Sequence, residues 1–364
     1  MTDILCTNCR RPYPDAGVPF RCPACGGVFD FAVSPKFDLA CLDSNLAGIW
    51  RFRHTFGFIK DAPLVTLGEG NTPLVWGKVN EYHIAFKLES QNPTGSFKDR
   101  GSALLVSFLL SRGVEAAVED SSGNAGASFA AYASRSGIKA KVFVPDHSSG
   151  PKRAQIEAYG AEVVRVLGAR SNASKAVLRA VEQGAVYASH AYLPIGLPGF
   201  ATIAYELVEQ MDGAPGTVVC PVGHGSLLLG IGKGFNALKE AGLISVTPRL
   251  IGVQALACAP LWALSAYGPA GLGWVTEGET LAEGIRITHP IHGDALFQMV
   301  ESSGGLFLAV EEEHILIGRD QLARQGFYVE PTSSVVWQAL NQIVNQTPEP
   351  VVAVLTGSGF KYRE

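Results

Sequence analysis

The sequence has no excess of basic residues and no long apolar run. Lys and Arg number 29 against 33 Asp and Glu, so the formal net charge is −4, and the isoelectric point is near 6.1. Proteins that neutralise many nucleic-acid phosphates or bind an anionic membrane surface need a basic surplus, so both classes are excluded. No run approaches the roughly 20 apolar residues of a membrane-spanning helix, and residues 1–11 lack the apolar core of a signal peptide. We expect a soluble, cytoplasmic protein.

Charged residues are also scarce, at 17% of the chain, whereas hydrophobic residues make up 47% and the mean hydropathy is +0.17. This composition supplies a large core and excludes disorder over most of the chain. A length of 364 residues is about twice that of an ordinary domain, which favours two or three domains. The 41 Gly and 21 Pro are more than a helical bundle needs and favour an α/β fold with many short turns.

Short apolar runs alternate with amphipathic stretches along most of the chain. Strands are predicted at 83–89, 140–146, 162–168, 185–189, 217–223, 249–255 and 351–357, and helices at 101–113, within 123–137, and at 151–161, 171–184 and 227–239. Helices of 10–15 residues between buried strands are typical of parallel sheets with helices on both faces. The predicted fold class is therefore α/β with parallel sheets flanked by helices.

Four of the seven cysteines lie near the N-terminus, as Cys6-x2-Cys9 and Cys22-x2-Cys25. Each Cys-x2-Cys turn places two thiolates within reach of one tetrahedral ion at about 2.3 Å, so the spacing predicts a zinc ribbon in residues 1–32. Four sulfur ligands leave no open coordination position, which makes the zinc structural. Two other interpretations are a ribbon without metal and a redox pair, although a quartet disfavours the latter. The other cysteines, expected to be free thiols in a reducing compartment, are Cys41, Cys220 and Cys258.

Residues 90–101 place Lys98 between a turn rich in small residues and an apolar helix. A solvated lysine near a helix start is the plain interpretation, but its charge opposes the helix macrodipole there, which favours a chemical role. Two glycine-containing turns, 121–124 and 223–226, each follow a strand and begin a helix. Backbone amides at such turns bind carboxylates and phosphates. The 223–226 turn alone is weak evidence, and a plain strand–helix turn is the alternative interpretation of 121–124, because glycine turns of this kind are common.

Six segments occur in the order in which threonine synthases carry their motifs. They are LGEGNTPL (67–74), NPTGSFKDRG (92–101), SSGNAGASFAAYA (121–133), PVGHGS (221–226), EPTSS (330–334) and LTGSGFK (355–361). The sequence therefore resembles the threonine synthases, which are pyridoxal-phosphate (PLP) enzymes of the tryptophan-synthase β-subunit superfamily, also called fold type II. Some members of that family carry an N-terminal zinc ribbon. The Asp-Arg-Gly that follows Lys98 is more similar to threonine synthases than to serine or threonine dehydratases.

The resemblance implies a large PLP-binding domain of residues 33–105 and 205–364, a small domain of residues 106–204, and a homodimer. It implies that Lys98 forms a Schiff base with PLP and later moves protons. It also implies that Asn124 bonds the phenolic oxygen of PLP and that Thr356 contacts the pyridine nitrogen. The residues implied to bind the PLP phosphate are Gly223, His224, Gly225 and Ser226, and those implied to bind the substrate are Ser121, Ser122 and Ser189.

Several positions depart from the threonine synthase pattern, which includes anchors for a substrate phosphate. Ala125 stands where that family usually carries Thr, Ala191 where it usually carries Asn, and Pro194 where it usually carries Arg. An arginine–phosphate contact contributes roughly 1.5–3 kcal/mol, so weaker phosphate binding is predicted. Cations that compensate for the loss are expected among Lys152, Arg153 and Arg286.

The leading hypothesis is a PLP-dependent carbon–oxygen lyase, a threonine synthase or close paralogue acting by elimination or replacement on a small amino acid, O-phosphorylated or not. The alternative enzyme is a serine/threonine dehydratase or a β-replacement enzyme that takes a non-phosphorylated amino acid. A third hypothesis is a PLP- or metabolite-binding protein without catalysis that uses the ribbon as a partner surface. The intact Lys98 argues against this third hypothesis.

Overall fold

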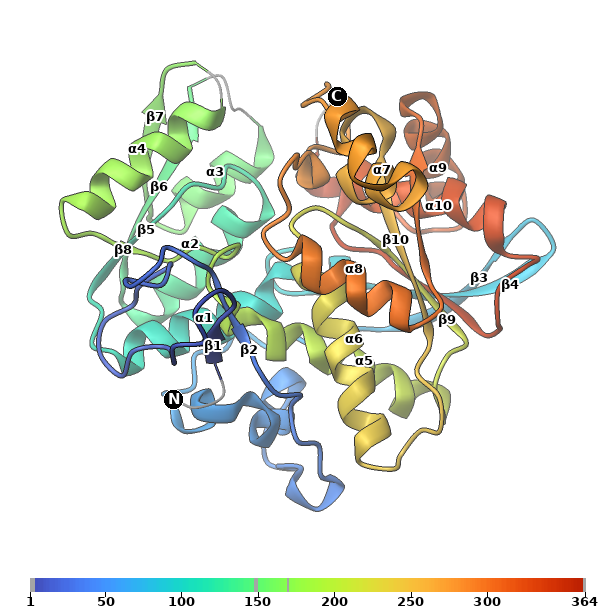
Figure 1. The fold of residues 1–364 in the computed structure, drawn as a ribbon, viewed down its shortest axis with the longest axis horizontal. Coiled ribbons are helices and arrows are strands. Elements are labelled where there is room, and N and C mark those ends of the chain that lie inside the picture. The colour runs from blue at the N-terminus through green and yellow to red at the C-terminus, as the bar shows by residue number, and fades with distance from the viewer. Residues whose placement is uncertain (1–3, 147–149, 169, 363–364) are drawn as a thin grey trace. The chain divides into compact units, whose positions relative to one another are not determined.

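The computed structural model describes residues 4–146, 150–168 and 170–362 (Figure 1). The strands are β1 (Ile4–Cys6), β2 (Phe29–Phe31), β3 (Leu74–Val79), β4 (Tyr82–Lys87), β5 (Ala116–Glu119), β6 (Lys139–Pro145), β7 (Glu162–Val166), β8 (Val186–Tyr187), β9 (Thr217–Pro221), β10 (Arg249–Ala255), β11 (Leu306–Val310) and β12 (Val351–Val354). The α-helices are α1 (Lys98–Ser111), α2 (Asn124–Ser136), α3 (Pro151–Ala158), α4 (Arg170–Glu182), α5 (Leu197–Met211), α6 (Ser226–Glu240), α7 (Pro260–Tyr267), α8 (Gly293–Ser302), α9 (Glu312–Arg324) and α10 (Pro331–Ile343).

The chain divides into two compact units, each described by itself. The first unit comprises Met1–Gly70, Asn92–Gly199 and Lys361–Glu364, and the second comprises Asn71–Gln91 and Phe200–Phe360. The division of the chain into three domains, made from the sequence, stays a prediction. No helix in the described part of the chain combines the length and the apolarity that crossing a membrane requires.

The first unit contains a four-stranded parallel sheet in the order β7-β6-β5-β8. Helices α2 and α4 pack against β6, and α1 packs on α2 (Figure 1). Because β5 and β8 are neighbouring parallel strands, the segments that follow them leave the same edge of the sheet. The backbone N–H of Ala188 donates to the carbonyl oxygen of Val118 at 2.9 Å and keeps these two strand ends together.

The N-terminal residues form a small ribbon within the first unit. Strands β1 and β2 are antiparallel, with Cys6 opposite Phe29. Ile4 and Phe29 are fully buried, and the ring of Tyr13 lies 4.7 Å from that of Phe29. With two strands of three residues, this ribbon has too small a core to fold by burial alone.

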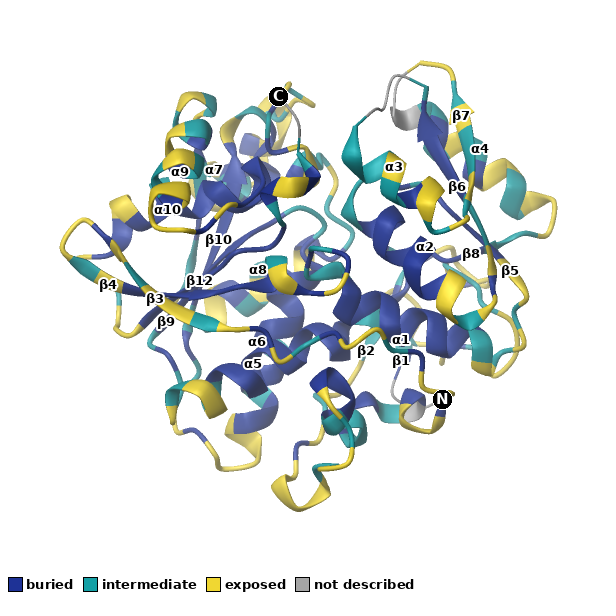
Figure 2. Ribbon diagram, turned by 180° about the vertical axis from the view of Figure 1, so that it is seen from behind, coloured by how far each residue is buried: buried dark blue, intermediate teal, exposed yellow. Residues whose placement is uncertain are grey.

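The second unit contains a six-stranded sheet in the order β11-β10-β9-β12-β4-β3. All neighbouring pairs are parallel except the edge strand β3, which is antiparallel to β4. Every residue of β9 is buried, as expected for a central parallel strand with helices on both sides, and Figure 2 shows the central strands in dark blue. The predicted fold class is confirmed. The exposed edge strand β3 and strand β11 lie outside the segments predicted as strands.

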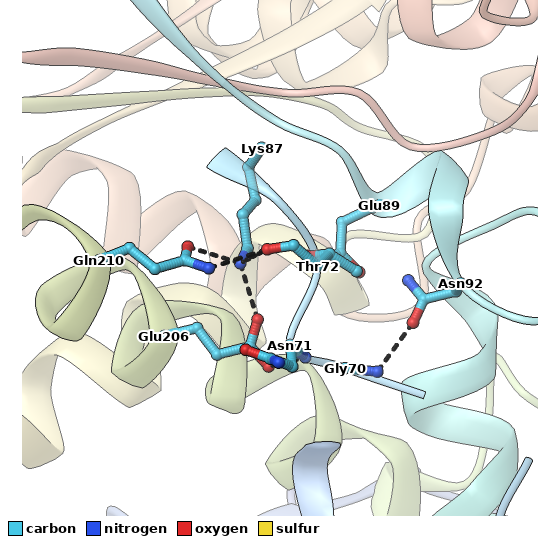
Figure 3. Close-up of polar contacts among 8 residues, drawn as sticks. All are labelled: Gly70, Asn71, Thr72, Lys87, Glu89, Asn92, Glu206 and Gln210. Carbon is cyan, nitrogen blue, oxygen red and sulfur yellow. Dashed lines mark hydrogen bonds and ion pairs between the residues drawn. The ribbon is translucent and has the colours of Figure 1, made fainter. Parts of the chain in front are cut away.

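A buried ion pair fixes β4 to α5 in the second unit (Figure 3). The ammonium of Lys87 donates to Oε2 of Glu206 at 2.7 Å, to the carbonyl oxygen of Thr72 at 2.8 Å and to Oε1 of Gln210 at 2.9 Å. The other carboxylate oxygen of Glu206 accepts from the backbone N–H of Asn71 at 2.7 Å. These contacts hold the segment that enters β3 against α5.

Candidate active site

The turn before α1 presents Lys98 as the first residue of the helix. Gly95 has a φ of +84°, and its N–H donates to the carbonyl oxygen of Asn92 at 2.7 Å, which closes the turn. The Lys98 side chain is half-buried, and its ammonium lies 4.7 Å from the centroid of the Phe97 ring. The predicted position of Lys98 at a helix start is therefore confirmed, whereas its attachment to PLP stays a prediction.

The next residue, Asp99, ties this turn to α2. Its fully buried carboxylate accepts from the backbone N–H and the hydroxyl of Thr94 and from the hydroxyl of Ser128, each at 2.6 Å. Burial raises the pKa of Asp99 to about 6, although the hydrogen bonds from Ser128 and Thr94 and the charge of Lys361 oppose the shift. Lys361 also donates to the carbonyl oxygen of Thr94 at 2.8 Å. Sequence reasoning singled out Asp99 only as part of a motif and missed this network.

The loop between β5 and α2 and the first residue of α2 together carry three of the predicted binding residues. Asn124 is the first residue of α2, and a Cβ on Gly126 would lie 1.8 Å from the carbonyl oxygen of Ser121. Only glycine permits this approach, so the strand and the helix meet in a tight turn. Ser121 is buried and Ser122 is half-buried, and the N–H of Gly123 donates to the hydroxyl of Ser121 at 3.3 Å. The backbone N–H groups at the start of α2 offer donors for a carboxylate.

The segment after β8 places Ser189 at the same edge of the sheet. The Ser189 hydroxyl accepts from the backbone N–H of Tyr192 at 3.2 Å. Nδ1 of His190 lies 2.5 Å from Oε1 of Glu119, the last residue of β5, so a buried carboxylate holds this turn against the neighbouring strand. In the first unit the structure therefore brings the 121–124 loop and the 189–192 turn together.

In the second unit, the turn at 223–226 joins β9 to α6. Gly225 has a φ of +96° and immediately precedes the 15 residues of α6, the first turn of which carries no acidic residue. A Cβ on Gly223 would lie 3.1 Å from the carbonyl oxygen of Gly284, and one on Gly225 would lie 3.1 Å from Leu296. The turn therefore packs closely against Gly284 and Leu296. The backbone amides that begin α6 are donors of the kind that binds a phosphate.

Thr356 follows β12, the neighbour of β9 in the sheet. Its buried hydroxyl lies 2.8 Å from the hydroxyl of Ser333, which also accepts from the backbone N–H of Gly357 at 2.8 Å. A pair of neutral hydroxyls fits a pyridine nitrogen that is not held protonated by a carboxylate. Sequence reasoning missed Ser333 as the partner of Thr356, because the two lie 23 residues apart.

Two residues that differ from the threonine synthase pattern, Ala125 and Pro194, are both buried. Ala125 lies in the first turn of α2 and is 4% exposed, and Pro194 begins a short 3-10 helix, Pro194–Gly196. Among the cations suggested as substitutes, Lys152 and Arg153 lie in α3, and Nε of Arg153 is 3.5 Å from Oε1 of Glu157.

The third suggested cation lies in the second unit. Arg286 donates to the carbonyl oxygen of Glu277 at 2.8 Å. This bond ties its guanidinium to the neighbouring backbone.

The four N-terminal cysteines gather as predicted. Their sulfur atoms all lie within 4.8 Å of one another, with Cys6 and Cys25 at 3.5 Å and Cys9 and Cys22 at 3.7 Å. Four thiolates around one zinc at the usual bond length lie about 3.8 Å apart, so the geometry fits a tetrahedral metal.

The backbone around Cys6 also favours a thiolate. Burial acts to raise its pKa, but the backbone amides of Cys9 and Asn8, together with hydrogen bonds from the Cys25 and Cys9 thiols, lower it to about 7. A Cβ on Gly27 would lie 2.9 Å from the Cys6 sulfur, so glycine is needed there. The quartet is able to hold a metal ion.

Comparison with known proteins decides the family. Residues 65–357 match a family described as pyridoxal-phosphate dependent enzyme. The chain belongs to this family. It is 31% identical to the threonine synthase of Methanocaldococcus jannaschii over 98% of this chain and 92% of the relative, and 35% identical to that of Synechocystis over 82% and 79%.

Solved structures of this PLP-dependent family share the fold. The T.th. threonine deaminase superposes with a TM-score of 0.65 at 27% identity, covering 80% of this chain and 94% of that one. Maize serine racemase gives a TM-score of 0.68 at 20% identity, covering 79% and 88%. The resemblance to fold type II PLP enzymes noted from the sequence is confirmed.

Proposed function

We propose that the chain is a threonine synthase or a close paralogue of one, a PLP-dependent carbon–oxygen lyase that acts by elimination and replacement on a small amino acid. The observation that carries this proposal is the 31% identity to a threonine synthase across 98% of the chain. Relatives with the same name reach 35% identity. Family membership alone does not determine the substrate, so the residues at the site must carry the rest of the argument.

Each unit, taken by itself, carries donors of the kinds that bind parts of PLP. In this proposal Lys98 holds the cofactor covalently, the amides of Gly223–Ser226 bind its phosphate, and Thr356 contacts its ring nitrogen. Asn124 donates to the phenolic oxygen. When bound, PLP supplies an electron sink for the substrate carbons.

The chain itself supplies binding and proton transfer. The backbone amides at Ser121 and Ser122 bind the carboxylate of the amino acid at the start of α2. The amine of Lys98 accepts a proton from the substrate α-carbon and returns it later, because a partly desolvated lysine exchanges protons readily. Asp99 keeps the Lys98 turn in register with α2 through Thr94 and Ser128.

The substrate's distal group is the point at which the candidates differ. Ala125 and Pro194 offer no donor side chain where threonine synthases usually bind phosphate. The loss of two contacts of about 1.5 kcal/mol each weakens phosphate binding by about 100-fold. We therefore propose as the second candidate a dehydratase or β-replacement enzyme for serine or threonine. The T.th. threonine deaminase, at 27% identity, supports that candidate.

Kinetics with purified holoenzyme separate the two candidates. The enzyme is incubated in turn with O-phosphohomoserine, serine and threonine, and phosphate, threonine and 2-oxo acid release are measured, with Lys98→Ala as the control. Threonine and phosphate release from O-phosphohomoserine at a micromolar KM supports the first candidate. Release of 2-oxo acid from serine or threonine, without turnover of O-phosphohomoserine, supports the second. Absence of PLP and of turnover in the wild type refutes both.

A further inference from the structure

The cysteine ribbon contacts the rest of the first unit at several places, and an arginine stands at two of them. At one of them, Arg112 follows the last residue of α1 and donates to the carbonyl oxygens of Pro14, at 3.0 Å, and Asp15. At the other, Phe20 and Arg21 precede the metal-ligating Cys22 and pack on the segment that begins with β8. The second contact reaches the 189–192 turn, which is proposed to bind substrate.

Arg21 bridges the second Cys-x2-Cys turn and Tyr192. Its Nη1 donates to the carbonyl oxygen of Gly26 at 3.0 Å, and its Nη2 donates to the hydroxyl of Tyr192 at 3.0 Å. The guanidinium carbon also lies 4.6 Å from the centroid of the Tyr192 ring. Gly26 directly follows Cys25, so the position of its carbonyl depends on the fold of the cysteine turn.

Phe20 adds an aromatic contact beside this bridge. Its ring lies 5.2 Å from that of Tyr187 and 5.4 Å from that of Tyr192, both edge to face. The Tyr187 hydroxyl in turn donates to Oδ1 of Asp120 at 2.7 Å. Edge-to-face pairs contribute beyond the area that they bury.

Tyr192 belongs to one of the turns that are proposed to bind substrate, and Tyr187, the last residue of β8, bonds the residue that precedes the other. Tyr192 donates through its backbone N–H to the hydroxyl of Ser189, and Asp120 directly precedes Ser121. The path from the cysteine turn to Ser121 and Ser189, two of the three serines proposed to bind substrate, therefore consists of direct contacts between side chains and of neighbouring backbone.

We propose that the metal-bound ribbon positions the substrate-binding turns, with Arg21 and Phe20 as the positioning residues. A metal at the cysteine quartet orders residues 20–26, because a ribbon of this size folds only with its metal. The ordered Arg21 and Phe20 then hold Tyr192 and Tyr187, and these hold the turns at Ser189 and Ser121. The role in substrate binding rests on the proposed function, whereas the ordering of the turns does not.

Arg21→Ala tests this proposal, with Arg112→Ala as the matched control, since both variants remove an arginine that joins the ribbon to the unit. Amide hydrogen exchange is followed in peptides from residues 116–124 and 186–196 of the holoenzyme. Arg21→Ala is expected to speed exchange in both segments. It is also expected to raise the KM for the amino acid that reacts by about 10-fold, at nearly unchanged kcat and PLP content. Arg21→Lys, which keeps a donor for Tyr192, is expected to recover part of the KM.

A variant that loses the metal tests the proposal in a second way. Cys22→Ser holoenzyme, with its metal content measured, is expected to show the same faster exchange at 186–196. If Arg21→Ala has the exchange rates and the KM of the wild type, the proposal is overturned. It is also overturned if Arg112→Ala has an equal effect, because both variants would then only loosen the attachment of the ribbon to the unit. If none of the three amino acids reacts, the proposed function fails, but the exchange measurements still decide whether the ribbon orders the turns.

Discussion

The hydroxyl of Ser128 in α2 donates a 2.6 Å hydrogen bond to Asp99, the residue after Lys98 in α1. This bond joins the helix that begins at Lys98 to the helix that begins at Asn124. Two residues proposed to act on the same cofactor thus stand on helices that share a fully buried carboxylate. The relative position of the two helix starts therefore depends on Asp99.

Asp99→Asn is expected to change how stability depends on pH. The folded-state pKa of Asp99 is about 6 against an ordinary value of 3.8, so the folded protein binds this proton more tightly than the unfolded chain. The contribution to stability is fully present below about pH 4 and is lost as the pH rises through 6. The wild type should therefore lose, relative to Asp99→Asn, on the order of 2–3 kcal/mol in free energy of unfolding between pH 4 and pH 7.

Denaturant unfolding of both proteins at several pH values measures this difference. Asp294→Asn, which changes an exposed carboxylate in α8, is the control for the loss of a surface charge. A difference for Asp99→Asn that stays constant with pH would show that Asp99 has an ordinary pKa in the folded state.

Lys98 is expected to carry PLP. Borohydride reduction of the holoenzyme followed by peptide mapping should find the pyridoxyl group on the peptide that contains Lys98. Lys98→Ala should lack the visible absorbance of covalently bound PLP, whereas Lys152→Ala should keep it. A label on another lysine contradicts the assignment.

The cysteine quartet is expected to hold one zinc ion. Cys22→Ser replaces a buried thiolate ligand and should lose the metal, because three sulfurs and a hydroxyl bind zinc far more weakly. Metal analysis measures the loss, and Cys41→Ser, which lies outside the quartet, should keep one zinc per chain. Undiminished zinc in Cys22→Ser would place the metal elsewhere.

The parts of the fold that the sequence predicted are those with strong local patterns. The central strand β9 lies in a nearly continuous apolar run, and the turn before Lys98 is rich in small and turn-forming residues. The edge strand β3 was not predicted, since only one of its six residues is buried and its pattern resembles a loop. Contacts such as Lys87 with Glu206 join residues that are 119 positions apart, and no local pattern reports them.

Lys87→Met is expected to destabilise the protein by about 3–5 kcal/mol, because it leaves the buried carboxylate of Glu206 without its ammonium partner. The double variant Lys87→Met/Glu206→Gln removes both charges and keeps an oxygen that accepts from the N–H of Asn71. It should recover much of the loss. Denaturant unfolding measures both variants, and equal stability of Lys87→Met and wild type would mean that the ion pair contributes nothing.

Asn124→Ala is expected to weaken catalysis more than cofactor binding. Asn124 is proposed to touch only the phenolic oxygen, while Lys98 and the amides of Gly223–Ser226 hold PLP by several bonds. The loss of one hydrogen bond to a charged oxygen, about 1.5–3 kcal/mol, should lower kcat/KM by about 10- to 100-fold.

The fold should tolerate this change, since Asn124 is the first residue of α2 and alanine is the residue most favourable to a helix. PLP content and absorbance, measured beside turnover, test the separation, and Asn172→Ala in α4 serves as the control with wild-type values for all three. If the Asn124→Ala enzyme instead accumulates without cofactor, then Asn124 contributes to holding PLP, and the amides that begin α6 bind the phosphate more weakly than the geometry of that turn implies.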